Sequence, residues 1–212
     1  MEIDVCNEKI ELLWQKAIFW KREGLLVVAD LHLGKVNHFR KAGIPVPLKA
    51  DFKNLEHLTS LIIQRKPQRV LFLGDLFHSH YNSAWESIKQ LIFSYQHISF
   101  ELVPGNHDIL SVNSYIRSGL QLHPEKFEHG PFVFTHHPLD TVPDNRYNIA
   151  GHVHPGIQLT GRGRQSVVLP CFYFSEQYAC LPAFGSFTGL YRICPKKSDR
   201  LFAVVDEKII KV

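Results

Sequence analysis

The sequence of 212 residues contains no apolar run long enough to cross a bilayer. Its longest runs, such as LLVVA at 25–29, fall far short of the roughly 20 residues that a membrane helix needs. The N-terminal stretch MEIDVCNEKIELLW has neither the basic start nor the apolar core of a signal peptide. We therefore expect a cytoplasmic protein that does not act at a membrane.

Cysteine is scarce, and no pair has the C-x-x-C spacing of a zinc or redox motif. In a cytoplasmic chain the four cysteines are expected to be free, buried thiols. A zinc site built from Cys171, Cys180 and Cys194 is the alternative. Helix-turn-helix, zinc-finger and aromatic-rich strand-binding patterns are also absent, which argues against sequence-specific DNA recognition.

Charge of one sign is not in large excess either. The chain has 24 basic and 20 acidic residues, and the net charge of +4 permits a phosphorylated partner without requiring one. Hydrophobic residues make up 45%, and the length suits a single domain at 1–212. What is abundant is histidine: eight of the 13 histidines fall in short clusters.

Short apolar runs alternate with segments of helical periodicity. Runs at 25–29, 70–73, 98–103 and 132–135 predict strands, whereas apolar residues recur at helical spacing over 48–65 and 83–95. This alternation predicts parallel β-α units in the first half, and the β-rich second half is expected to be antiparallel. The predicted fold is an α/β protein with two packed sheets and helices outside.

Five polar motifs each follow a short apolar run. They are DLH at 30–32, GDLFH at 74–78, GNHD at 105–108, HH at 136–137 and GHVH at 151–154. Because ligand crevices in α/β sheets lie at the carboxyl ends of strands, residues distant in sequence are expected to meet there. The expected set is Asp30, His32, Asp75, Asn106, His107, His136, His152 and His154.

This set offers carboxylates, an amide and imidazoles but no thiolate, which suits divalent first-row ions such as Mn, Fe or Zn. Asp30 and His32 alternate by two, as do His152 and His154, so on an extended backbone each pair points to one side. Asp75 has two oxygens on a short stem and can bridge two ions, which together would clamp a phosphate. We predict two divalent ions, with manganese as the first candidate and iron or zinc as alternatives.

The order D-x-H, G-D, G-N-H-D, H and G-H-x-H resembles the calcineurin-like metallophosphoesterase superfamily over residues 30–154. The resemblance implies a four-layer α/β/β/α sandwich that hydrolyses phosphate esters. It assigns one metal to Asp30, His32, Asp75 and His154, and the other to Asp75, Asn106, His136 and His152. It also implies that His107 acts as the acid or stabilises the transition state, with Asp108 orienting it.

The family pattern favours His136 over His137 as the ligand, because the family uses the first histidine after the strand. His137 would then flank the phosphate. His78 is expected to support a ligand by a hydrogen bond. His80 is expected to lie in a solvated loop.

Longer stretches of the sequence resemble one group within this superfamily. ADLHLGKVNHFRKAGIPVP, FLGDLFHSHYNSAW, GHVHPGI and LPAFGSFTGL resemble the bacterial DNA-ligase-associated metallophosphoesterases. This implies a Mn-dependent phosphodiesterase or endonuclease that works in DNA repair with a ligase, a helicase and an exonuclease.

The residues allow a phosphodiester or DNA substrate without requiring one. Lys35 and Arg40 follow the first ligand pair and could reach phosphate oxygens. TGRGRQ at 160–165 is either a solvated hairpin tip or a contact to a nucleic-acid backbone. Any contact to DNA is expected to be directed at the backbone and sensitive to salt.

Two other functions are open from the sequence. A nucleotide-sugar lipid pyrophosphohydrolase of lipid A synthesis also carries D-x-H-L, but that family usually adds an apolar helical cap, and no such insertion is evident here. A non-catalytic scaffold of the same fold would have lost ligands, whereas every expected ligand is present.

Overall fold

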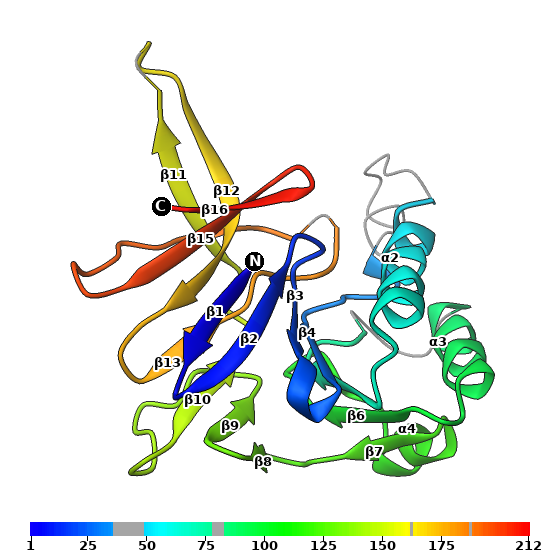
Figure 1. Cartoon of the computed structure of the whole chain (residues 1–212). Coiled ribbons are helices and arrows are strands. Elements are labelled where there is room, and N and C mark those ends of the chain that lie inside the picture. Colours follow the sequence, from blue (N-terminus) through cyan, green and yellow to red (C-terminus); the bar gives the residue numbers. More distant parts are fainter. Residues whose placement is uncertain (36–48, 78–82, 162, 187) are drawn as a thin grey trace.

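Two β-sheets packed face to face form the centre of the structure (Figure 1). The computed structural model describes residues 1–35, 49–77, 83–161, 163–186 and 188–212, and the statements below concern these ranges. Arg40, His78 and His80 lie outside them. The predicted α/β sandwich of two mixed sheets is confirmed by this arrangement.

The first sheet combines an antiparallel meander with a parallel half. Its strand order is β1 (Glu2–Val5), β2 (Glu8–Leu13), β3 (Ala17–Trp20), β4 (Leu25–Ala29), β5 (Arg69–Leu73), β6 (Ser99–Val103) and β7 (Leu120–Leu122). Neighbours from β1 to β4 run antiparallel, with the short 3-10 helix η1 (Lys21–Glu23) before β4, and neighbours from β4 to β7 run parallel. The parallel half confirms the predicted β-α units, whereas the three strands before β4 were not predicted.

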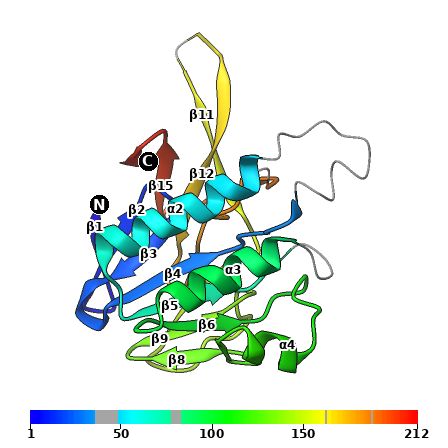
Figure 2. The same cartoon turned by 90° about the vertical axis from the view of Figure 1, so that its right-hand side faces the viewer.

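Three helices cover one face of this sheet: α2 (Lys49–Arg65), α3 (Ser83–Ser94) and α4 (Val112–Arg117) (Figure 2). Leu58 and Leu61 of α2 and Ile88 of α3 are fully buried against the sheet, where they join Val28 and Phe72 in one cluster. These contacts fix the parallel strands, and therefore the positions of their carboxyl ends.

The second sheet is made by the rest of the chain. Its strands are β8 (Phe127–His129), β9 (Phe132–Thr135), β10 (Tyr147–Ala150), β11 (Pro155–Thr160), β12 (Ser166–Phe174), β13 (Tyr178–Cys180), β14 (Tyr191–Arg192), β15 (Arg200–Val205) and β16 (Lys208–Lys211). The expectation of an antiparallel second half was partly wrong, because β10 pairs in parallel with both β9 and β13. Parallel pairing directs the chain ends after β9 and β10 toward the same edge.

The inner faces of the two sheets share one apolar core. Trp20, Val27 and Leu71 of the first sheet meet Phe132 and Phe172 of the second, and all five are at most 1% exposed. On the outer face of the second sheet, in the described ranges, no helix packs. A smaller cluster around Tyr173 and Leu201 covers that face instead.

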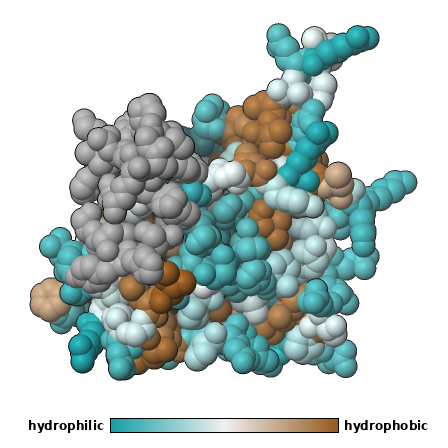
Figure 3. All heavy atoms as spheres, turned by 180° about the vertical axis from the view of Figure 1, so that it is seen from behind, coloured by the Kyte–Doolittle hydropathy of each residue, from teal (hydrophilic) through white to brown (hydrophobic). Residues whose placement is uncertain are grey.

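The β11–β12 hairpin projects beyond both sheets (Figure 1). Its stem carries apolar side chains on the surface, as Figure 3 shows, including Val167 and Val168, which are 51% and 40% exposed. Among the helices of the described ranges, none is long and apolar enough to cross a membrane.

A buried ion cluster ties β5, β6 and the chain after β7 together. Glu101 is 1% exposed and accepts two hydrogen bonds from Arg69, at 2.6 and 2.9 Å, and Nε2 of His123 lies 2.6 Å from its Oε2. Burial raises the pKa of Glu101, but the hydrogen bonds and charges of Arg69 and His123 outweigh burial and hold the pKa below its ordinary value. The carboxylate is therefore ionised at neutral pH and stabilises the parallel half of the sheet.

Glu101→Gln is expected to lower the free energy of unfolding by about 3 kcal/mol at neutral pH, because it leaves a partly buried guanidinium without its counter-charge. A carboxyl with a lowered folded pKa stabilises the protein above its unfolded pKa of about 4.3 and loses that contribution as the pH falls through the folded value. The difference between wild type and variant should therefore shrink below about pH 4. Urea denaturation at several pH values measures it.

The matched control is Glu128→Gln, which removes an exposed pair with Lys126. That change should alter the free energy of unfolding by less than about 0.5 kcal/mol. Equal effects of the two variants would contradict a structural role for the buried cluster.

Candidate metal centre

The polar motifs gather where strands of both sheets end, and much of their backbone is left-handed. Asp30, His32, Asp75, His152 and His154 have φ between 48° and 65°. Residues other than glycine rarely adopt this region, and such strain persists where the surrounding structure enforces it, often at functional sites. The pairs D-x-H and H-x-H therefore reach the site through left-handed turns, which corrects the expectation of an extended backbone.

Asp30, His32 and His154 form one group at the end of β4. Nε2 of His32 lies 3.4 Å from Nε2 of His154, and Nε2 of His154 lies 3.4 Å from Oδ1 of Asp30. One donor atom from each of the three residues falls within 4.8 Å of the others. These are three of the four side chains that the resemblance assigns to the first metal.

Asp75, Asn106 and His136 form a second group beside the first. Nε2 of His136 lies 3.1 Å from Oδ1 of Asn106, 3.6 Å from Oδ1 of Asp75 and 3.1 Å from Nδ1 of His152. Asp30, Asp75 and His136 also bring one donor atom each within 4.8 Å. Oδ2 of Asp75 also lies 3.9 Å from Nε2 of His32, so Asp75 lies between the two groups, as a bridging ligand would.

The hydrogen bonds of His136 show which way its lone pair points. Its Nδ1 lies 3.0 Å from the carbonyl oxygen of Leu73, which can only accept, so Nδ1 carries the proton. In the neutral ring Nε2 is then an acceptor, yet an amide oxygen and a carboxylate oxygen face it. Several lone pairs aimed at one region are what a cation between them would stabilise.

Asp30 tests directly whether this donor set fits a metal. Its side chain is fully buried, its Oδ2 accepts the backbone N–H of His152 at 2.9 Å, and its Oδ1 has no hydrogen-bond partner among the residues that the structure describes. A buried carboxylate oxygen without a partner is costly unless a positive charge lies nearby. The buried carboxylates and the imidazoles therefore fit divalent ions.

His137 lies next to this region but differs from His136. His136 is 3% exposed, whereas His137 is exposed and its ring lies 3.8 Å, centroid to centroid, from the ring of His152. Burial and the neighbouring imidazole of His136 lower the pKa of His137, and burial with both neighbours lowers that of His152. A lowered pKa favours the neutral form of the His137 and His152 rings, and a neutral imidazole keeps a lone pair that can bind a metal or accept a proton.

Asp108 has a different role from the expected one. Its Oδ1 accepts the backbone N–H groups of Leu76 and Phe77 at 3.0 and 3.2 Å, and its Oδ2 accepts that of Gly105 at 2.9 Å. In the part of the chain that the structure describes, these backbone N–H groups are the partners of Asp108, which therefore joins the loops after β5 and β6. Burial raises the pKa of Asp108 to about 6, against the opposing effect of these backbone hydrogen bonds.

His107 and Lys35 border the two groups. The ring of His107 lies 5.7 Å from the ring of His32, and its backbone N–H donates to Oδ1 of Asp75 at 2.9 Å. The backbone N–H of Lys35 donates to the carbonyl of His32 at 3.2 Å, which ties Lys35 to the first group. Burial lowers the pKa of Lys35, and the charges of Asp75 and Asp30 partly oppose that effect.

The glycines of the motifs are required by close packing, which the sequence alone did not reveal. A Cβ on Gly74 would collide with the ring of His136, and one on Gly105 with Oδ1 of Asp75. A Cβ on Gly151 would lie 2.7 Å from Oδ2 of Asp30. Each glycine therefore leaves room for a predicted ligand from another motif.

Asn148 is a supporting residue that the sequence reading did not identify. It is fully buried in β10, and its amide donates to Oγ1 of Thr135 at 2.8 Å while its Oδ1 accepts the N–H of Leu139 at 2.9 Å. Oγ1 of Thr135 in turn donates to the carbonyl of His137 at 2.6 Å. These bonds fix the loop that carries both histidines, and the signal for them is a polar residue inside the apolar run YNIA.

Gly105→Ala is expected to weaken Mn²⁺ binding by about 10- to 100-fold, because the added methyl group must displace Asp75. Calorimetric titration of the metal-free protein measures this affinity. Gly163→Ala is the matched control, since a Cβ there meets nothing within 4 Å and should leave the affinity unchanged. Unaltered Mn²⁺ binding by Gly105→Ala would argue against Asp75 as a ligand.

Comparison with solved structures gives a strong likeness. A nuclease from Pseudomonas putida, described as nuclease MPE, superposes with a TM-score of 0.84 at 27% identity and covers 100% of this chain and 99% of its own. The Escherichia coli phosphoesterase Yfce reaches only 0.47 at 15% identity, covering 89% of this chain and 97% of its own. No curated protein matches the chain. The nuclease fits the resemblance to the ligase-associated family.

The model of the family described as calcineurin-like phosphoesterase matches residues 25–167, which include every motif of the centre. The match covers well over half of the chain and confirms the resemblance seen in the sequence. The chain therefore belongs to the calcineurin-like phosphoesterase family and is a metal-dependent phosphoesterase.

Proposed function

We propose that residues 1–212 form one domain that hydrolyses phosphodiester bonds of nucleic acid at a centre of two divalent ions, with Mn²⁺ the first candidate. The observation that carries this proposal is the convergence of two buried carboxylates, Asp30 and Asp75, with His136 and His154 at 3.4–3.9 Å. The nuclease from Pseudomonas putida supports nucleic acid as the substrate class.

The residues divide into two sets around Asp75. Asp30, His32 and His154 would hold one ion with it, and Asn106, His136 and His152 the other. When bound, two divalent ions neutralise charge on the phosphoryl oxygens and lower the pKa of a water nucleophile. The chain's part is to hold these donors in place, which the hydrogen bonds of Leu73, Asp108 and Asn148 accomplish.

His107 is proposed as the group that serves the leaving oxygen. Its backbone is anchored to Asp75, and its ring borders that of His32 without being fully buried. An imidazole in this place can donate a hydrogen bond or a proton to the leaving alkoxide. Asp108 acts as a positioning residue, since it holds the backbone of Gly105 and Leu76. Lys35, and His137 beside His152, are proposed to contact the substrate.

The cellular setting belongs to the same proposal. DNA repair and cooperation with a ligase, a helicase and an exonuclease rest on the sequence resemblance alone, and the cytoplasmic location is the expectation drawn from the composition of the sequence. The lipid-pyrophosphohydrolase alternative gains no support from the connection between β6 and β9, which is fully described: it holds the six-residue α4 and two three-residue strands. An apolar helical cap does not occur there.

Asp75→Asn is expected to lower turnover of bis-p-nitrophenyl phosphate by about 1,000-fold or more, because it removes the charge that both ions would share. Circular dichroism and thermal melting should show that the variant is folded. His97→Ala, which changes an exposed histidine remote from the centre, should keep wild-type turnover. Wild-type rates in folded Asp75→Asn would rule out the two-metal proposal.

Chelation is expected to abolish hydrolysis, and added Mn²⁺ to restore it in proportion to occupancy up to two ions per chain. Elemental analysis of the purified protein measures the metal content. Titration with Mn²⁺ measures the return of activity, on a panel of single-stranded DNA, nicked DNA and lipid-linked diphosphates. Hydrolysis that persists after chelation, with no metal detected, would contradict the proposal. Metal-free, inactive protein under all conditions would favour the scaffold.

A further inference from the structure

A cavity of about 500 Å³ opens beside the candidate metal centre. This tyrosine cavity is lined by Tyr173, Tyr178, Tyr191, Val153, Ile193 and, at one edge, His152. Its volume lies within the range of small-molecule sites, about 300–1,000 Å³. Because His152 belongs to both the cavity and the centre, a ligand in the cavity would adjoin a phosphate bound at the metals.

The three tyrosines of the cavity differ in burial, from the buried Tyr173 to the exposed Tyr191. Tyr173 is 7% exposed, and its hydroxyl donates to Oδ2 of Asp199 at 2.9 Å, so its phenol is fixed in place. The ring of Tyr178 meets the ring of Tyr173 edge to face, with 5.7 Å between centroids. Tyr191 is 66% exposed and presents its ring to incoming molecules.

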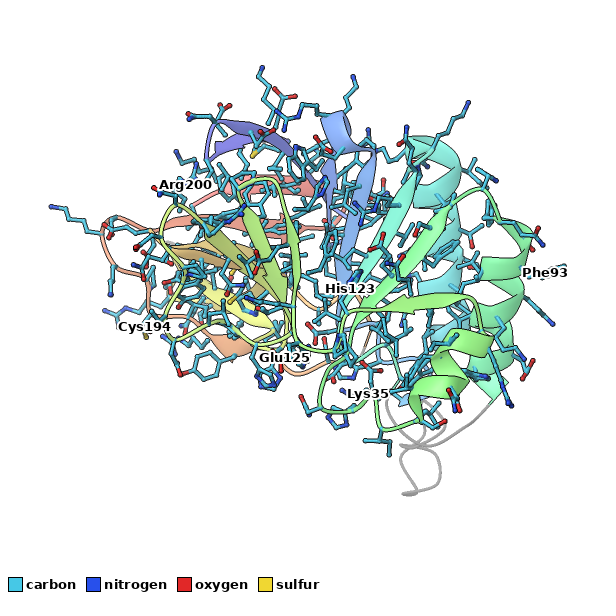
Figure 4. The ribbon with its side chains drawn as sticks, turned by 90° about the horizontal axis from the view of Figure 1, so that it is seen from below. Lys35, Phe93, His123, Glu125, Cys194 and Arg200 are labelled. Atoms are coloured by element: carbon cyan, nitrogen blue, oxygen red, sulfur yellow. The ribbon has the colours of Figure 1, made fainter. Side chains whose placement is uncertain are left out.

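The backbone ties Tyr191 to the candidate metal centre. Its N–H donates to the carbonyl of His154 at 2.9 Å, and β14 pairs in parallel with β11 directly after that histidine. Figure 4 shows the neighbouring Cys194 on the side of the second sheet, far from Phe93 on α3. The aromatic wall is therefore held in a fixed relation to His152 and His154.

The lining of the cavity selects the chemistry of its ligand. Among the described residues, no lysine, arginine, aspartate or glutamate side chain lines it, so these residues offer no charged partner for a second phosphate. Aromatic side chains bind flat rings by stacking and edge-to-face contacts. Stacking of a nucleobase on an aromatic side chain is worth about 1–3 kcal/mol and tolerates any base sequence.

We propose that the tyrosine cavity binds the nucleobase next to the scissile phosphate, and that the exposed ring of Tyr191 stacks on this base. The inference rests on the proposed phosphodiesterase function and deepens it. A base paired within a duplex cannot enter the cavity without leaving its stack, whereas an unpaired base can. Tyr191 is a specificity residue in this arrangement.

The test compares two short fluorescein-labelled single strands of equal length: oligothymidylate, and the same backbone with every base replaced by an abasic spacer. Wild type should prefer oligothymidylate in kcat/KM with Mn²⁺. Tyr191→Ala should reduce that preference by about 10-fold, and Tyr191→Phe should retain it, because the ring and not the hydroxyl makes the contact. Fluorescence anisotropy with metal-free protein should show the same order of affinity. Phe93→Ala, which removes an exposed aromatic ring remote from the cavity, is the control and should keep the wild-type preference.

The outcomes separate the inference from the function on which it rests. If wild type cleaves both strands equally well, or if Tyr191→Ala lowers both rates by the same factor, the nucleobase site is wrong and the phosphodiesterase function stands. A wild-type preference for duplex over single-stranded DNA would also overturn the inference. If wild type hydrolyses bis-p-nitrophenyl phosphate but neither strand, nucleic acid is the wrong substrate class and both proposals fall.

Discussion

The structure depends on keeping two negative charges out of water at the seam of two sheets. Asp30 and Asp75 are 0% and 3% exposed, and the side chains around them are mainly imidazoles and an amide. An isolated buried carboxylate would be strongly unfavourable, so the site is stable only where cations or protons balance it. The donor geometry, the glycines that make room for it and the strained backbone all serve this one requirement.

Much of the fold could be predicted from apolar periodicity. The observed bounds match the predicted ones to within a residue for two strands, 25–29 and 132–135, and for the helix that begins at Lys49. The strands β1 to β3 were not predicted. β1, for example, has four residues, two of them acidic, and such a stretch is too short for an apolar period to be recognised. The parallel pairing of β10 was also not predicted, because strand direction is decided by tertiary contacts and not by composition.

The candidate site shows the same division. The topology of the sheet predicted that the ends of the strands would bring the motifs together. The structure places His136 and His154 3.9 and 3.4 Å from Oδ1 of Asp30. The left-handed backbone of the D-x-H and H-x-H motifs, the backbone contacts of Asp108 and the collision that requires Gly105 depend on distances between segments. The tyrosine cavity could not be predicted for a similar reason, because its rings come from three strands that only the fold brings together.

The contact between His32 and His154 joins positions 122 residues apart, across the join between the two halves of the chain. Contacts of such long range form late, after the intervening loop entropy has been overcome. The donors of each ion come from segments that meet only in the folded chain, so a metal is not expected to nucleate folding in the way that zinc nucleates a zinc finger. Metal binding is then expected to follow folding, and the apolar core has to stabilise the metal-free protein.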